Sequence, residues 1–126
     1  MVLVLDEPLS FWGGVDPETG RIIDRRHPQH SQNVAGRVLV MSAGRGSSSS
    51  STVLAECLRA ETGPAAIVLR EADEILVVGA LVAQFLDGSV MPIIQLDEAS
   101  FARLQSGDEV SIDREGEIRL LAKSAR

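Results

Sequence analysis

The chain is poor in cysteine and in aromatic residues, and both shortages limit what it can be. Its 126 residues include one cysteine, Cys57, so no disulfide can form within the chain and a reducing compartment is expected. A single thiol cannot hold a zinc ion or an iron–sulfur cluster, so another chain must supply the ligands of any metal that takes part. With one tryptophan, three phenylalanines and no tyrosine, the core has to be aliphatic.

Long apolar runs and an excess of positive charge are also lacking. No apolar run approaches the roughly 20 residues that cross a bilayer, and the N-terminal segment has no basic start and is acidic from Asp6 onward, unlike a signal peptide. The formal net charge of −6 argues against a nucleic-acid partner. We therefore expect a cytoplasmic protein that binds neither membrane nor nucleic acid. Five arginines between Arg21 and Arg45 form a local basic segment, which suits a small anionic ligand or an acidic partner surface, or is a solvated loop.

The length and apolar content indicate one domain over residues 1–126. Apolar runs predict strands, and apolar residues at helical spacing predict helices. The expected strands are 2–5, 22–23, 37–41, 65–69 and 91–96, with a hairpin of 109–112 and 118–121; the expected helices are 51–60, 79–86 and 98–105. Residues 75–78 fit either a strand or the start of a helix. The alternation predicts an α/β fold, with a partly parallel central sheet flanked by helices and a small antiparallel sheet to which the first strand could also belong.

The run from Gly44 to Ser51 is the most informative segment. It reads Gly-Arg-Gly followed by five serines, and it lies between an expected buried strand and an expected helix. Glycines let the backbone approach a ligand closely, and the N–H groups of a helix N-terminus attract negative charge. Serine runs are also typical of flexible linkers and of helix caps, so a linker and a purely structural turn remain alternatives. We favour a loop that holds an anion or a reacting oxygen.

Several motifs together resemble the small subunit of the aconitase X family. They are Trp-Gly-Gly-Val-Asp-Pro-Glu-Thr-Gly at 12–20, Asp24 with His27-Pro28, Gly-Arg-Val-Leu-Val at 36–40, and the loop at 44–51. The resemblance implies a swivelling β/β/α domain and a cytoplasmic hydro-lyase, either a cis-3-hydroxy-L-proline dehydratase or a phosphomevalonate dehydratase. It also implies a large-subunit partner that holds an iron–sulfur cluster, while this chain binds no cofactor itself and is inactive alone. The arginine-rich, lysine-poor composition looks bacterial and favours cis-3-hydroxy-L-proline.

The resemblance further implies that Ser47 is the catalytic proton acceptor. A serine hydroxyl must approach an alkoxide to take a proton from carbon, and a helix N-terminus with glycine N–H groups can stabilise that charge. Arg45 could pair with the substrate carboxylate. The substrate-binding residues that we expect are Arg45, Gly46, Ser48, Ser51 and Gly14. No metal ligand is expected in this chain.

Two other functions stay open from the residues alone. The same loop could serve a non-catalytic anion-binding module. His27 or His30 could accept a phosphoryl group in a swivelling phosphotransfer domain, although a surface or interface role is favoured for both. We interpret Gly13, Gly14 and Asp16 either as a second substrate-facing loop or as a tight turn, and Trp12 as a packing or subunit-contact anchor.

Overall fold

The computed structural model describes residues 1–46, 48–113 and 115–124. Its strands and helices alternate through the first two thirds of the chain. In chain order the elements are β1 (Val2–Val4), α1 (Phe11–Gly14), β2 (Val38–Met41), α2 (Ser49–Arg59), β3 (Ala66–Leu69), α3 (Glu74–Asp87), β4 (Ile93–Gln95), α4 (Glu98–Ala102), β5 (Glu109–Ile112) and β6 (Ile118–Ala122).

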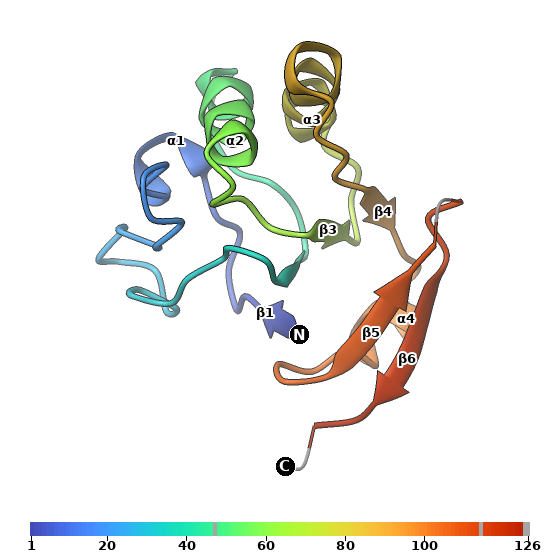
Figure 1. Cartoon of the computed structure of the whole chain (residues 1–126). Helices are drawn as coiled ribbons and strands as arrows, with labels where there is room; N and C mark the ends of the chain where they lie inside the picture. The colour runs from blue at the N-terminus through green and yellow to red at the C-terminus, as the bar shows by residue number, and fades with distance from the viewer. Residues whose placement is uncertain (47, 114, 125–126) are drawn as a thin grey trace.

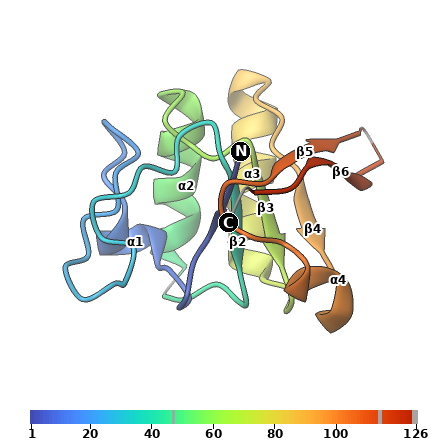
Figure 2. The same cartoon turned by 90° about the horizontal axis from the view of Figure 1, so that it is seen from below.

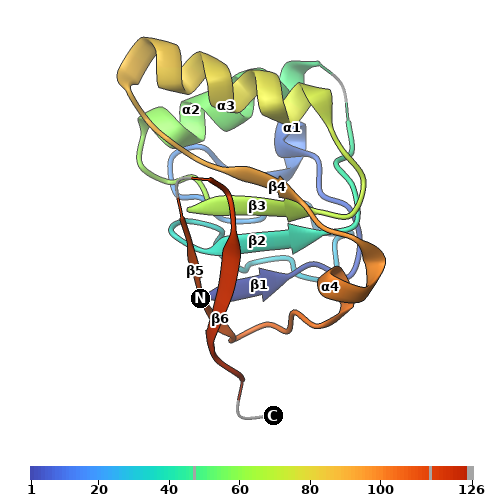
Figure 3. The same cartoon turned by 90° about the vertical axis from the view of Figure 1, so that its right-hand side faces the viewer.

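The central sheet has the order β1-β2-β3-β4, and every neighbouring pair is parallel. Figure 3 shows the four strands running in one direction, with the helices on one side and the hairpin across the other. Both faces of the sheet are apolar, as expected when a parallel sheet is covered on both sides. On β2, Leu39 and Met41 join the cluster under the helices, whereas Val38 and Val40 join the cluster under the hairpin.

Helices α2 and α3 form the layer on one face of the sheet and run side by side (Figure 2). They approach closely because α3 has Gly79 where it crosses α2. A Cβ atom at Gly79 would lie 2.7 Å from the carbonyl oxygen of Ser51. The side chain of Asp73 caps α3 by accepting a hydrogen bond from the N–H of Leu76, at 3.1 Å.

The β5–β6 hairpin and α4 cover the other face (Figure 1). Asp108 ties the hairpin to the rest of the molecule from a fully buried position. Its carboxylate accepts hydrogen bonds from the backbone N–H groups of Gln105 and Ser124, at 2.9 and 2.7 Å. Its carbonyl accepts a hydrogen bond from the N–H of Val2, at 2.8 Å, which joins β1 to the same point. The order of layers is therefore hairpin, sheet, helices, which confirms the β/β/α expectation.

Three details differ from the sequence-based expectations. Residues 75–78 lie inside α3, because the Asp73 cap starts the helix before them. The first strand pairs with β2 in the parallel sheet and not with the hairpin. The expected strand at 22–23 is reduced to isolated bridges, one of which joins Val15 to Ile22.

Two helix boundaries also differ between the sequence-based expectation and the structure. Helix α2 begins at Ser49, which is two residues earlier than expected, so Ser50 and Ser51 belong to its first turn. Helix α4 ends at Ala102 and not at Gln105. Its expected cap is confirmed, because the side chain of Asp97 accepts a hydrogen bond from the N–H of Ser100, at 2.7 Å. Within the part of the chain that the structure describes, no helix has the length and hydropathy that a bilayer crossing requires.

Candidate functional site

The loop from β2 to α2 lies at the carboxyl end of a central strand, where parallel sheets commonly bind ligands. Ser47, the expected proton acceptor, lies outside the described residues. The residues on either side of it, Gly46 and Ser48, are both exposed. Ser48 precedes the first turn of α2, and its carbonyl accepts hydrogen bonds from the N–H and Oγ of Ser51, at 3.1 and 2.7 Å. The first turn of α2 contains no acidic residue, so nothing there offsets the positive end of the helix dipole.

Gly46 is fixed by two buried or half-buried hydroxyl groups. Its φ of +108° is a conformation that other residues rarely adopt. A Cβ atom there would collide with the Oγ of Ser10 and lie 3.0 Å from the Oγ of Ser50. Those two hydroxyl groups are 3.3 Å apart, and the N–H of Trp12 donates to Ser50 Oγ, also at 3.3 Å. The segment that carries Ser10 and Trp12 therefore braces one side of the loop.

The other side of the loop rests on the start of α3. A Cβ atom at Gly44 would collide with Asp73 and lie 3.2 Å from Leu76 Cδ1. Asp73 is itself held by its capping hydrogen bond to Leu76. Gly44 and Gly46 are thus confined between the Ser10 segment and the N-terminus of α3, in each of which a backbone N–H donates a hydrogen bond to a side-chain oxygen. The close packing of these two glycines is unlike a flexible linker.

Arg45 projects from this loop and is half exposed. Its guanidinium lies 3.8 Å from the carboxylate of Glu7, a distance and exposure at which an ion pair contributes little. The guanidinium is therefore available to an anion that offers better geometry, for example two oxygens of one carboxylate.

The remaining expected substrate-binding residues occupy different places. Ser51 is half-buried, donates its hydroxyl to the Ser48 carbonyl and packs against Gly79. Gly14 is buried, and its carbonyl accepts a hydrogen bond from the N–H of Ile23 in the turn-rich segment before β2. Arg45, Gly46 and Ser48 are consecutive around Ser47, whereas Ser51 and Gly14 serve packing and turn geometry in this structure. Substrate binding by all five stays a prediction.

Comparison with known proteins identifies the family. The sequence profile described as "Aconitase X swivel domain" matches residues 1–120. The chain belongs to the aconitase X swivel-domain family. The aconitase X of Thermococcus kodakaraensis, in its holo-form, has the same fold, with a TM-score of 0.82 and 35% sequence identity over 95% of this chain and 86% of that one.

Two kinds of curated relatives match this swivel domain. It is 51% identical over 90 residues to a protein named cis-3-hydroxy-L-proline dehydratase from Pseudomonas aeruginosa. The matched residues make up 71% of this chain but 16% of that protein. It is 41% identical over 119 residues to the phosphomevalonate dehydratase small subunit of Methanothermobacter thermautotrophicus. The matched residues make up 94% of this chain and 87% of that subunit. The chain therefore spans about a sixth of the first relative and most of the second.

His27 has a structural role in this swivel domain and not a role at the surface. It is 5% exposed. Its Nε2 lies 2.9 Å from the carbonyl oxygen of Glu7, and its Nδ1 accepts a hydrogen bond from the N–H of Gln29, at 3.0 Å. Both ring nitrogens are thus occupied by backbone groups, which disfavours the phosphohistidine alternative at this residue. His30 is exposed and lies 3.1 Å from Ser31 Oγ.

The structure bears on the interpretations of Trp12 and Asp16. The Trp12 side chain is 61% exposed, so it does not anchor the core, and its role in a subunit contact stays a prediction. Asp16 accepts hydrogen bonds from the N–H groups of Glu18 and Gly20, at 2.9 and 2.7 Å, which is the geometry of a tight turn. The segment around Gly14 and Asp16 thus has the turn structure that the sequence allowed.

Cys57 does not take part in the chemistry of the loop. Its side chain is fully buried on the inner face of α2. Burial raises the pKa of its thiol to about 11, an effect that a hydrogen bond with Thr62 only partly offsets. The thiol therefore stays protonated near pH 7 and is a poor nucleophile and ligand. Among the described residues, no group of three or more histidine, cysteine, aspartate or glutamate side chains is arranged to hold a metal ion.

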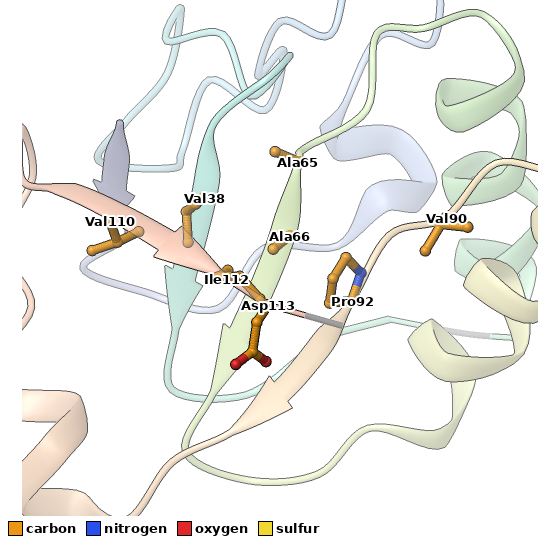
Figure 4. Close-up of a pocket in the computed structure, with 8 residues that line it drawn as sticks. All are labelled: Val38, Ala65, Ala66, Val90, Pro92, Val110, Ile112 and Asp113. Carbon is orange, nitrogen blue, oxygen red and sulfur yellow. The ribbon is translucent and has the colours of Figure 1, made fainter. Parts of the chain in front are cut away.

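A large groove lies between the central sheet and the hairpin, away from this loop. It has a volume of about 670 Å³ and is bordered by the first residues of β2 and β3 and by the end of β5 (Figure 4). Its lining is apolar except for Asp113, whose Oδ1 accepts hydrogen bonds from the N–H groups of Glu115 and Glu117 in the hairpin turn. A groove with one occupied carboxylate, at the amino ends of the strands, does not resemble a catalytic site.

Sequence reasoning missed Ser10 and Ser50, the two hydroxyl groups that fix Gly46. A signal for Ser50 was present, because Ser50, Leu54 and Cys57 are spaced i, i+4, i+7 and all three are buried on one face of α2. The expected helix began one residue too late to include Ser50. Nothing in the sequence signals Ser10, which lies 40 residues from Ser50.

Proposed function

We propose that this chain is the small subunit of an aconitase X-type dehydratase and delivers Ser47 to an active site completed by a cluster-bearing large subunit. The observation that carries the proposal is the confined loop, in which Gly46 is held against Ser10 and Ser50 next to the N-terminus of α2. The family membership supports it, as do relatives named as dehydratases or as a dehydratase small subunit. We expect the complex to work in the cytoplasm, where the single thiol Cys57 stays reduced.

We propose cis-3-hydroxy-L-proline as the substrate. The relative named for this activity shares 51% identity with the chain, against 41% for the phosphomevalonate relative. Phosphomevalonate is the second candidate, because that relative is a small subunit of similar length that the chain covers almost throughout. Arg45 suits the carboxylate that both substrates carry.

The chemistry assigned to this chain is removal of a proton. Ser47 Oγ, as an alkoxide or close to one, takes the proton from the carbon next to that bearing the hydroxyl group. The electron pair of the broken C–H bond forms the C=C bond, and the hydroxyl group leaves with the C–O bonding pair. The departing hydroxide takes a proton from an acid of the large subunit or from solvent, so that one water is lost in total. Negative charge on the serine oxygen before transfer is favoured by the positive end of α2. The described residues of this chain offer no cluster site, so assistance to the leaving hydroxyl falls to the large subunit.

The test is turnover by the reconstituted complex. Wild-type chain mixed with the large subunit should dehydrate cis-3-hydroxy-L-proline, and neither chain should do so alone. Ser47→Ala should lower kcat by about a thousandfold, because general acid–base groups contribute rates of that order. Exposed Ser111→Ala, on strand β5 of the hairpin, is the matched control and should keep wild-type turnover.

Three results would contradict the proposal. Retained turnover in Ser47→Ala would remove Ser47 from the mechanism. If the complex dehydrates phosphomevalonate and not cis-3-hydroxy-L-proline, the substrate that we propose is wrong. Full activity of the chain without a large subunit would overturn the division of the site between two chains.

A further inference from the structure

Helix α3 is apolar on both sides, although only one side is covered. Between Glu74 and Asp87 its only polar side chain is Gln84. The inner stripe consists mostly of small residues, Gly79, Ala80 and Ala83, with Leu76. The large residues instead form the outer face of α3, which we define as Val77, Val78, Leu81, Val82, Phe85 and Leu86.

The exposure of this outer face is unusual for a surface helix. All six side chains are at least 40% exposed, and Phe85 reaches 88%. A helix that is apolar all round is normally buried within a larger assembly, because a solvated helix carries polar residues on its outer side. Helix α3 lies at the edge of the helical layer, with α2 as its only helical neighbour among the described elements (Figure 1). The outer face therefore gathers more exposed large apolar side chains than any other element of the described chain.

Charged residues lie beside this apolar surface, on its α2 side and at the two ends of α3. A groove of about 210 Å³ runs along it between α3 and α2, lined on the α3 side by Val82 and Leu86. On the α2 side it is lined by Glu56 and Arg59, which form an exposed ion pair at 3.6 Å. Asp87 closes its end. An apolar centre with a charged rim is the usual anatomy of a protein–protein interface.

The outer face begins where the candidate site ends. Gly44, in the loop that carries Ser47, packs against Asp73 and Leu76 at the start of α3. The next turn of α3 packs against Ser51 in the first turn of α2. A body that closes over the loop therefore lies next to the first exposed apolar residues of α3, Val77 and Val78. The two surfaces are continuous.

Resting on the proposed function, we infer that the outer face of α3 is the surface on which the cluster-bearing large subunit docks. The relative from Methanothermobacter is named a small subunit, so a second subunit is expected there, and the Pseudomonas relative is about six times longer than the part that matches. The complementary surface is apolar, with basic residues opposite Glu74 and Asp87.

A second copy of this chain fits the outer face less well. Two copies related by a two-fold axis would pair α3 with itself, either antiparallel or parallel. In the antiparallel arrangement Glu74 meets Asp87, and in the parallel arrangement each acid meets its own copy. Both place like charges together at the rim, which disfavours association.

The test measures the affinity of the chain for the large subunit of the same organism by titration calorimetry. Leu81→Glu/Phe85→Glu should raise Kd at least a hundredfold, and Leu81→Ser/Phe85→Ser should raise it to a smaller extent. The control is Leu121→Glu, which places one such charge on a leucine of β6 that is 64% exposed, close to the 58% of Leu81, and should leave Kd within about threefold of wild type. Circular dichroism of each variant confirms folding.

The outcomes separate this inference from the proposed function. Ser47→Ala should lose turnover and keep its affinity, whereas the α3 variants should lose affinity. An unchanged Kd for the large subunit in both α3 double variants overturns the docking surface. The docking surface is also overturned if the wild-type chain forms a dimer that these variants dissociate while their Kd for the large subunit stays the same. If the wild-type complex forms but dehydrates neither hydroxy acid, the proposed function fails, and the measured affinities still decide the docking surface.

Discussion

At the scale of single residues, Gly46 is the position at which shape matters most. We predict that Gly46→Ala lowers kcat of the reconstituted complex at least tenfold, because the new methyl group would collide with Ser10 and approach Ser50 and so displace the neighbouring Ser47. Gly36→Ala is the control, since Gly36 also has a positive φ, of +70°, but has open space around its missing Cβ. Equal turnover in the two variants would contradict the role of close packing around the loop.

The sequence indicated this region but not the residues that hold it. Glycines followed by serines between a strand and a helix predict a constrained helix N-terminus, and the structure has one there. The partner of Gly46, Ser10, could not be predicted, because the contact depends on how a turn-rich segment folds back across α2. His27 shows the same difficulty: its ring is buried and both of its nitrogens meet backbone groups, of Glu7 and Gln29, which no local pattern reveals.

At the scale of elements, the contact between α2 and α3 depends on the missing side chain of Gly79. We predict that Gly79→Val lowers the free energy of unfolding by about 1–3 kcal/mol, the usual cost of overpacking. The new side chain would push against the backbone of Ser51 and the Cβ of Leu54, so the helices must separate. Gln84→Ala, exposed on the same helix, should change stability little. Thermal or urea unfolding of the isolated chain measures both, and equal stability would contradict the close packing.

The elements themselves were largely predictable, and the exceptions have a physical cause. Strand-length apolar runs gave β2, β3 and β4, because a parallel sheet covered on both faces needs continuous apolar sequence. The same continuity made residues 75–78 ambiguous, since a helix that is apolar all round produces an identical short run. The capping side chain of Asp73 decides in favour of the helix. The sequence was ambiguous because α3 is apolar all round, and for the same reason α3 has an exposed apolar face.

At the scale of the whole molecule, the layers are joined where the hairpin meets the first strand, at Asp108. Burial raises the pKa of the Asp108 carboxyl. The hydrogen bonds from the backbone of Gln105 and Ser124 and from Lys123 together lower the pKa by more than burial raises it, so the pKa lies below its usual value. A carboxyl group whose pKa is lower in the folded state stabilises the fold above its unfolded pKa of about 3.9. That stabilisation is lost as the pH falls through the lower folded value.

We predict that Asp108→Asn melts several degrees below wild type at pH 7, and that the difference shrinks as the pH falls below the unfolded pKa of about 3.9 and through the lower folded pKa. Asparagine keeps one carbonyl oxygen but loses the charge that faces Lys123 Nζ, 3.0 Å away. Asp87→Asn, an exposed carboxyl at the end of α3, is the control and should melt close to wild type at each pH. Melting followed by circular dichroism at half-unit pH steps decides the question. A constant offset between Asp108→Asn and wild type at every pH would show that the carboxyl is held by shape alone, and that its charge does not join the hairpin to the sheet.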